Sequence, residues 1–222
     1  NSIVCSLLMG KSPDQVRLLM LDPKRVGLAP YRHIPHLLGP VRLGTEEASE
    51  ALSGLVETME DRLGVLQKAS ARDIYSFNRR SVEEMPYIVV IADELADLVI
   101  QGGAPVQRDL VRLSQLGRAA GIHLVLATQR PTTDVVTGLI KANITARIAF
   151  KTSSSTDSRV VLDQVGAEKL LGNGDMLLLS GQSHAPVRVQ CAWVGEDEIQ
   201  TLVTHWERQV PNLENIRSVG GA

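Results

Sequence analysis

Six short apolar runs along the chain have the length and composition of buried strands. They cover residues 16–21, 87–92, 122–127, 147–150, 175–179 and 187–191. The first three lack the alternation of polar and apolar residues that a half-exposed strand shows, and such runs are typical of strands covered by helices on both faces. The pattern therefore predicts a buried and mostly parallel sheet.

The segment between the first two runs predicts a long amphipathic helix. Thr45 is the expected N-cap, and Glu46 and Glu47 follow in the first turn, where negative charge suits the helix dipole. Apolar residues then recur at the spacing of one buried helical face. They are Leu52, Leu55, Val56, Met59, Leu63 and Leu66.

Two more helices are predicted downstream. One starts near Glu196, and the other follows Pro105, stops at Gly121 and directs three leucines inward, Leu110, Leu113 and Leu116. Alternating strands and helices predict an α/β fold with a doubly wound, mostly parallel sheet and helices on both faces. The runs at 175–179 and 187–191 are the exception, because their connector favours an antiparallel hairpin at the edge of that sheet.

A single domain is expected over residues 1–210, with a flexible tail over residues 211–222. A length of 222 residues suffices for one α/β domain with a sizeable core. Only 3% of the residues are aromatic, so aliphatic side chains must fill that core. This composition favours helices packed on parallel strands over an aromatic-rich β-sandwich.

Charge and cysteine content narrow the class of protein. The formal net charge of -2 argues against a broad basic face for nucleic acid, so any contact with DNA must rely on a few local cations. Cys5 and Cys191 lie far apart without C-x-x-C spacing, which argues against a metal site or a disulfide framework and fits reduced thiols in the cytosol. No apolar run approaches the ~20 residues of a membrane span.

The strongest chemical signal follows the run at 87–92, which ends in Asp93 and Glu94. An apolar strand that ends in Asp-Glu is typical of the Walker B motif of P-loop ATPases, and it delivers both carboxylates to the edge where α/β sheets bind ligands. Asp93 would hold Mg²⁺ through its water shell, and Glu94 would orient or deprotonate the attacking water. The alternative is that one of the two merely caps the next helix.

A second signal is Gln129, which follows the run at 122–127. A polar residue at the tip of the strand beside Walker B can contact the γ-phosphate or the attacking water. The alternative is an ordinary polar end of a strand.

Gly10, Lys11 and Ser12 match the end of the phosphate-loop pattern G-x-x-x-x-G-K-[ST]. The first glycine of the pattern would fall at Cys5, and Pro13 stands where the loop should open into a helix. We interpret this segment as a turn from a helix to a strand.

Several longer strings carry a resemblance to a known family. They lie at residues 21–24 (LDPK), 34–38 (IPHLL), 86–90 (PYIVV), 118–131, 137–144, 157–159 (DSR) and 171–177 (LGNGDML). Over about residues 1–208 the chain resembles the motor domain of the FtsK/SpoIIIE DNA translocases, because these strings occur in the order of the family. The string at 118–131, RAAGIHLVLATQRP, is the most specific of them.

The resemblance implies a RecA-like P-loop NTPase core that uses ATP and Mg²⁺. The family comprises hexameric ring ATPases that pump double-stranded DNA in chromosome segregation and cell division. By resemblance, Asp93 and Glu94 take the Walker B roles, Gln129 takes the sensor role, and Arg118 matches the arginine finger that reaches the ATP of a neighbouring subunit. The alternative for Arg118 is a solvated cation that satisfies carbonyls at a helix end.

The resemblance also implies a set of DNA contacts. Thr128 and Arg130 match one pore loop, and Lys141 and Arg159 match the second. A ring multiplies a few cations sixfold around one duplex, and phosphate contacts let a motor slide over any sequence. The alternative for Lys141 and Arg159 is simple surface solvation. Many relatives have a lysine where this chain has Ser155, which removes one expected phosphate contact.

The phosphate-binding loop of the family is expected upstream of Asn1, so we expect the chain alone not to turn over ATP. We expect a cytoplasmic motor domain. Many relatives carry a membrane anchor upstream of this domain, and the sequence leaves open whether the parent protein does. Two rival interpretations stay open. One is a ring ATPase that moves protein or conjugative DNA, and the other is a non-catalytic ring scaffold that binds DNA.

Overall fold

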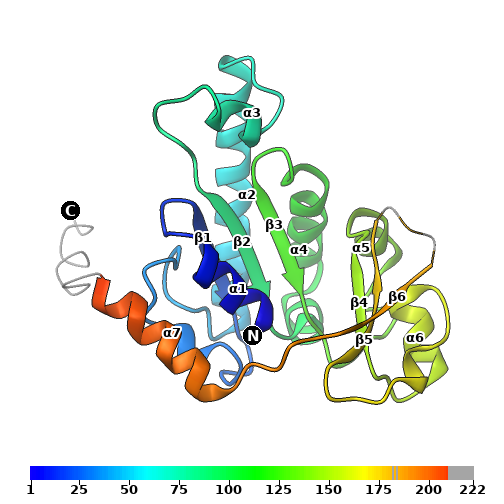
Figure 1. The fold of residues 1–222 in the computed structure, drawn as a ribbon. Coiled ribbons are helices and arrows are strands. Elements are labelled where there is room, and N and C mark those ends of the chain that lie inside the picture. The colour runs from blue at the N-terminus through cyan, green and yellow to red at the C-terminus, as the bar shows by residue number, and fades with distance from the viewer. Residues whose placement is uncertain (182, 184, 210–222) are drawn as a thin grey trace.

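The computed structural model describes residues 1–181, 183 and 185–209 (Figure 1). Three strands form a parallel sheet in the order β1-β2-β3, with bounds Val16–Leu21, Tyr87–Ala92 and Ile122–Leu126. The register places Leu21 beside Ala92, and Ala92 beside Leu126. The predicted parallel sheet is confirmed, and the carboxyl ends of its three strands meet at one edge.

Helices cover both faces of this sheet, as predicted (Figure 1). On one face the core includes Leu52 and Leu110, and on the other it includes Val4 and Val203. The helices of the first face are α2 (Thr45–Lys68) and α4 (Leu95–Leu116), and those of the second are α1 (Ser2–Gly10) and α7 (Glu196–Gln209).

The two ends of the described chain pack against each other. The indole Nε1 of Trp206 in α7 donates a hydrogen bond to the carbonyl of Leu8 in α1 at 2.9 Å. Helix α1 ends at Gly10, and residues 11–15 turn into β1. The interpretation of the Gly-Lys-Ser segment as a turn from a helix to a strand is therefore confirmed.

Helix α4 begins earlier than predicted. It starts at Leu95, directly after the acidic pair, and not after Pro105. Gly103 interrupts it with φ of 60° and ψ of -147°, a conformation that a residue with a side chain rarely adopts, and the helix resumes around Pro105. The prediction therefore recognised only the second part of a kinked helix.

Two smaller predictions about helices were wrong. The N-cap of α2 is Gly44 rather than Thr45, whose hydroxyl donates to the side chain of Gln101 at 2.9 Å. Leu116 is 46% exposed, although the other two leucines predicted to face inward are buried. The buried face continues from Leu113 to Gly117, four residues on, so Leu116 falls outside it.

The remaining strands form a second, antiparallel sheet in the order β4-β5-β6, beyond the β3 side of the first (Figure 1). Their bounds are Arg147–Phe150, Asp175–Leu179 and Val187–Gln190. The predicted β5–β6 hairpin is confirmed. Its expected place at the edge of the parallel sheet is wrong, because β5 pairs with β4, which was also expected to be parallel. Short helices complete the fold: α3 (Ile74–Asn78), α5 (Gly138–Asn143) and α6 (Ser155–Leu162).

Two expectations concern the ends of the chain and membranes. The predicted tail over residues 211–222 lies outside the described residues. Within the part of the chain that the structure describes, none of the helices is both long and apolar enough to cross a membrane.

An ion pair joins the strands of the hairpin. Arg188 donates through Nε and Nη2 to the two carboxylate oxygens of Asp175 at 2.9 and 2.7 Å, and the amide of Leu171 donates to the same carboxylate at 2.8 Å. These bonds, that of Arg188 first, lower the pKa of Asp175 from 3.8 to about 2. Because the pKa is depressed in the folded chain, the pair stabilises the fold above the unfolded pKa and loses this effect as the pH falls toward 2.

We predict that Asp175→Asn lowers the free energy of unfolding near neutral pH. The gap between the natural chain and the variant should narrow as the pH falls from about 4 to about 2, because protonated Asp175 no longer pairs with the guanidinium. Urea unfolding at a series of pH values measures this gap. Asp61→Asn, on the exposed surface of α2, is the matched control. A gap independent of pH would contradict the prediction.

Candidate active site

The carboxyl edge of the parallel sheet gathers polar side chains from three successive strands. Asp22 follows β1, Asp93 and Glu94 follow β2, and Thr128 comes two residues after the end of β3. The backbone ties the strand ends together, because the amide of Leu95 donates to the carbonyl of residue 127 at 2.7 Å. The predicted Walker B pair therefore lies at the sheet edge where the sequence placed it.

Glu94 is buried at this edge, with 1% of its surface exposed. Its Oε2 accepts a hydrogen bond from Lys24 Nζ at 2.7 Å, and its Oε1 accepts one from the Thr128 hydroxyl at 2.5 Å. The amide of Gln129 lies 3.2 and 3.3 Å from the two oxygens, and the amide of Ala96 lies 3.4 Å from Oε1. Glu94 thus caps α4 and also binds the two neighbouring strand ends.

These contacts keep Glu94 charged in a buried place. Burial by itself raises its pKa, but the hydrogen bonds from Lys24, Thr128 and the Gln129 amide outweigh burial and set the pKa below its ordinary value. The same bond to Glu94 raises the pKa of Lys24, whose ammonium also lies 3.9 Å from Asp97. Glu94 is therefore ionised near neutral pH.

The loop that carries Lys24 is shaped by a buried carboxylate. Asp22 is fully buried and accepts hydrogen bonds from the amides of Val26 at 3.3 Å and Leu28 at 2.9 Å. Arg25, which directly follows Lys24, takes a left-handed φ of 61°. A buried carboxylate satisfied by main-chain amides fixes the path of the loop, and this path places Lys24 over Glu94.

Asp93 has the opposite electrostatic environment. It is half-buried, and burial, followed by the nearby charges of Asp22 and Glu94, raises its pKa. Gly27 packs so closely that a Cβ there would lie 2.5 Å from Oδ2 of Asp93. A divalent cation beside Asp93 would offset the crowding of negative charge, so the residue fits the expected role at Mg²⁺.

The described part of the chain offers such an ion few ligands. Over residues 1–181, 183 and 185–209, no group of three or more His, Cys, Asp or Glu side chains is arranged to hold a metal. Mg²⁺ commonly keeps several waters and binds through one or two carboxylates together with substrate phosphates. Asp93 accords with that mode of binding, in which water and nucleotide complete the shell.

The other predicted catalytic residues lie in two different places. Gln129 is exposed beside Glu94 and contributes its main-chain amide to that carboxylate. Arg118 is exposed between α4 and the start of β3, at the end of the strand opposite to Glu94. The structure therefore does not bring Arg118 together with the acidic pair.

The predicted DNA contacts fall into two groups. Thr128 and Arg130 lie beside Glu94, and the Thr128 hydroxyl points at that carboxylate. Lys141 in α5 and Arg159 in α6 lie near the second sheet. Arg130 and Arg159 are exposed, whereas the ammonium of Lys141 is bound by an acid.

That acid is Asp163, which the sequence analysis did not single out. It directly follows α6 in a left-handed conformation and pairs with Lys141 at 2.7 Å and Arg147 at 2.5 Å. The two cations lower its pKa, Arg147 first. Lys24 was missed as well, although a basic residue just after a buried strand, beside the Asp-Glu pair, would have been a usable signal.

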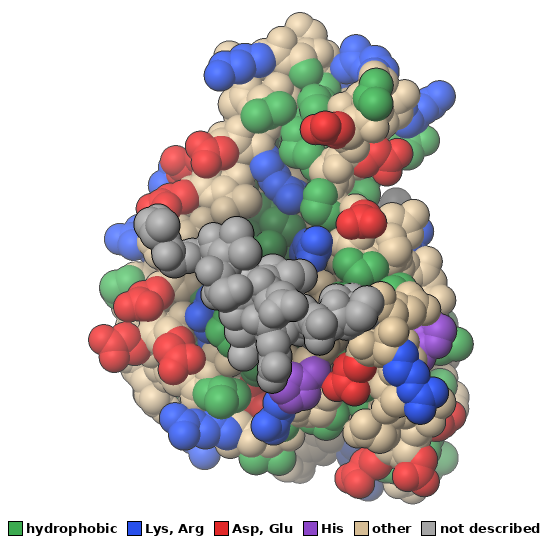
Figure 2. Space-filling view, turned by 90° about the vertical axis from the view of Figure 1, so that its left-hand side faces the viewer, with side chains coloured by type: hydrophobic (Ala, Val, Ile, Leu, Met, Phe, Trp, Pro, Cys, Tyr) green, Lys and Arg blue, Asp and Glu red, His purple; other side chains and the backbone are tan. Residues whose placement is uncertain are grey.

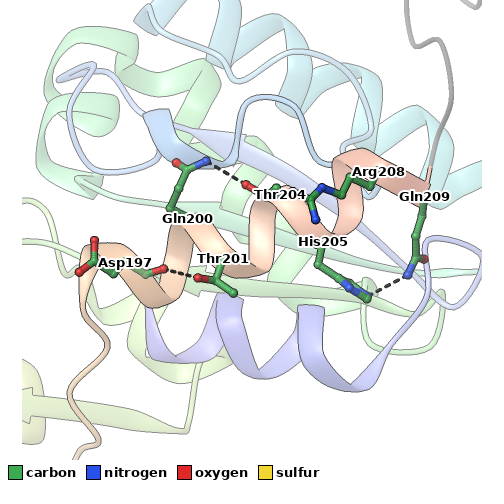
Figure 3. Close-up of a pocket in the computed structure, with 7 residues that line it drawn as sticks. All are labelled: Asp197, Gln200, Thr201, Thr204, His205, Arg208 and Gln209. Atoms are coloured by element: carbon green, nitrogen blue, oxygen red, sulfur yellow. Dashed lines mark hydrogen bonds between the residues drawn. The ribbon is translucent and has the colours of Figure 1, made fainter.

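The surface of the molecule adds two observations. On the face in Figure 2, lysine and arginine side chains are interspersed with aspartate and glutamate, in keeping with the near-neutral charge. Figure 3 labels the residues that line a hollow along α7, and among the described residues all of them belong to that helix. Several of them bond within the helix, as Thr201 does to the carbonyl of Asp197 at 2.7 Å. We therefore interpret the hollow as helix surface and not as a binding site.

The sequence of this chain is similar to those of known proteins over most of its length. The model of the FtsK/SpoIIIE family matches residues 1–85 and 78–133. DNA translocase SpoIIIE of Bacillus subtilis is 50% identical over 215 residues, covering 92% of this chain and 27% of that protein. DNA translocase FtsK of Streptococcus pneumoniae is 47% identical over 220 residues, covering 94% of this chain and 29% of that protein. The chain thus spans about a quarter of the length of these relatives.

Solved structures support the fold. The pCW3 conjugation coupling protein TcpA superposes with a TM-score of 0.77 at 26% identity, over 91% of this chain and 59% of that one. The type VII secretion ATPase EccC of Thermomonospora curvata gives a TM-score of 0.76 at 23% identity, over 92% of this chain and 25% of that one. The predicted RecA-like α/β core is thereby confirmed. From its sequence and its fold together, the chain belongs to the FtsK/SpoIIIE family.

Proposed function

We propose that this chain is the motor part of an ATP-dependent translocase that moves double-stranded DNA in chromosome segregation or cell division. The observation that carries the proposal is Glu94, a buried and ionised carboxylate at the carboxyl edge of a RecA-like sheet, next to a second acid, Asp93. Membership of a family whose relatives are named DNA translocases supports the choice of DNA as substrate.

Each of the residues at the sheet edge would have a separate role in ATP hydrolysis. Asp93 would hold Mg²⁺ through water, and the ion would supply charge neutralisation on the phosphates. Glu94 would take a proton from the attacking water, for which its lowered pKa keeps it in the charged form. Gln129, exposed beside it, would contact the γ-phosphate or that water.

ATP hydrolysis also needs a phosphate cradle. The pattern G-x-x-x-x-G-K-[ST] does not occur in the 222 residues. Among the described residues, β3 pairs on one side only, with β2, so its other edge is open to a further strand. We propose that a segment outside these residues adds the missing strand and its phosphate loop at this edge.

The cations near the second sheet support contact with phosphate. Lys141 is held by Asp163 at 2.7 Å, an arrangement that fixes its direction but offsets its charge. A DNA phosphate would compete with Asp163 for the same ammonium, since both are oxygen anions. Arg159 is exposed on helix α6, so a DNA phosphate can reach it without displacing Asp163.

The comparisons also bear on the rival functions. Structures of a conjugation protein and of secretion ATPases share the fold at 26% identity or less, whereas the DNA translocases reach about 50%. This difference favours chromosomal DNA over protein or conjugative DNA as the substrate. An ionised Glu94 beside Asp93 favours a catalytic subunit over an inactive scaffold.

We predict that the 222-residue chain alone does not hydrolyse ATP, because it lacks the phosphate loop. A longer product of the same gene that includes that loop should hydrolyse ATP, and Glu94→Gln should lower kcat by about 10²-fold or more, since it removes the general base. Release of phosphate measures both. Glu57→Gln, on the exposed face of α2, is the matched control. Mg²⁺-dependent hydrolysis by the 222-residue chain, abolished by Glu94→Ala, would refute the prediction.

We predict that Lys141→Ala and Arg159→Ala each weaken binding to duplex DNA of any sequence. Each should reduce the slope of log affinity against log salt by about 0.9, the value for one lost phosphate contact. Asp163→Asn should strengthen binding, because it removes the competing anion. Fluorescence anisotropy across a salt series measures these effects, with Lys68→Ala as the control. Unchanged affinity in both cation variants would favour a protein substrate.

We predict that the longer protein forms a hexameric ring with nucleotide and DNA, which native mass measurement can establish. In such a ring Arg118→Ala should abolish most ATP hydrolysis while leaving ATP binding to the same subunit intact, because the guanidinium would act on a neighbour. Mixing Arg118→Ala subunits with Glu94→Gln subunits should restore some ATP hydrolysis, at those interfaces where one subunit supplies Arg118 and its neighbour supplies Glu94. A fully active Arg118→Ala protein would remove Arg118 from the reaction.

A further inference from the structure

The hydroxyl of Thr128 joins two residues that belong to different parts of the proposed motor. It donates to Oε1 of Glu94 at 2.5 Å, and it accepts a hydrogen bond from the main-chain amide of Arg130 at 3.0 Å. Thr128 is half-buried, Arg130 is exposed, and Glu94 is buried. One side chain therefore bridges a surface loop and the enclosed carboxylate.

Glu94 has little capacity left for a water molecule in this arrangement. A carboxylate offers about four acceptor positions. Here the hydroxyl of Thr128, the ammonium of Lys24 and the amides of Ala96 and Gln129 already direct hydrogens at its two oxygens. To accept a proton from water, Glu94 must first lose one of these donors.

Thr128 is the donor most directly tied to the surface loop. The Ala96 amide belongs to the first turn of α4, and Lys24 sits on a loop fixed by Asp22. By contrast, residues 128–130 contribute both the hydroxyl and an amide to Glu94 and also the amide that holds the hydroxyl in place. A displacement of the Arg130 backbone therefore changes the bonds of Glu94.

We propose that Thr128 is a positioning residue that withholds Glu94 from water until duplex DNA engages the loop carrying Arg130. The inference rests on the proposed function, since it takes DNA as the ligand of Arg130 and Glu94 as the proton acceptor. When a DNA phosphate draws Arg130 outward, the Thr128 hydroxyl loses its partner on the loop and turns from Glu94. The freed oxygen of Glu94 then accepts a hydrogen bond from the attacking water and can take its proton.

The bridge itself can be tested in the 222-residue chain without ATP or DNA. The amide resonance of Arg130 is compared between the natural chain and Glu94→Gln, and the comparison is repeated in the Thr128→Val and Thr128→Ser backgrounds. We expect Glu94→Gln to shift this resonance with threonine or serine at the position, and to shift it much less with valine.

The amide of Ala96 is the internal reference for that comparison. It also faces Glu94, but without passing through Thr128, so it should respond to Glu94→Gln in every background. An equal shift of the Arg130 amide in all three backgrounds would overturn the bridge. Should the valine variant fail to fold, Thr128→Ala replaces it with the same expectation.

The use of the bridge is tested in the longer protein that hydrolyses ATP. Thr128→Val should raise kcat without DNA by up to about tenfold, the effect of one lost charge-assisted hydrogen bond, and should reduce the stimulation by duplex DNA. KM for ATP should stay unchanged. Thr128→Ser should restore the natural behaviour, and Thr201→Val, on the exposed surface of α7, should have no effect.

The two ways in which this could fail are distinct. A loss of kcat by the same factor with and without DNA would mean that Thr128 merely supports the site, and it would overturn the inference while leaving the proposed function standing. If the natural protein hydrolyses ATP with no response to DNA, both the proposed function and the coupling to DNA are overturned. The resonance comparison then still decides whether Thr128 links Arg130 to Glu94.

Discussion

A carboxylate that is almost wholly removed from water keeps its charge only if hydrogen-bond donors surround it. Glu94 meets this condition through three separate segments, the loop after β1, the first turn of α4 and the turn after β3. These segments come together only because the three parallel strands end at the same level. The charge of Glu94 therefore depends on the common level at which the three strands end.

Hydrogen-bond donors compensate other buried carboxylates in the same way. Two other buried acids are also matched by nearby donors, Asp175 by Arg188 and Asp22 by main-chain amides. Asp93 is the contrasting case, because its neighbours raise its pKa rather than lower it. The near-neutral net charge therefore coexists with sharply different local fields, which the composition could not reveal.

The sequence predicted the six strands to within a residue, because continuous apolar runs report burial directly. It did not predict that these strands divide into two sheets, since the choice of pairing partner depends on contacts far apart in the chain. Leu116 was assigned to the core because the pattern was continued at a spacing of three, whereas the helix continued it at four. Lys24 and Asp163 escaped notice because their partners lie 70 and 22 residues away.

Helix α5 contacts the first sheet's core through a buried side chain and the edge of the second sheet through an ion pair. Ile140 packs in the main core, while the adjacent Lys141 holds Asp163 at the edge of the second sheet. No ladder hydrogen bond joins the two sheets over the described strands. The second sheet is therefore joined to the core by the short backbone segment between α5 and β4, by the packing of α5, and by an ion pair that is open to solvent. Because salt screens such exposed pairs, the part of this connection that rests on the Lys141–Asp163 pair weakens as ionic strength rises.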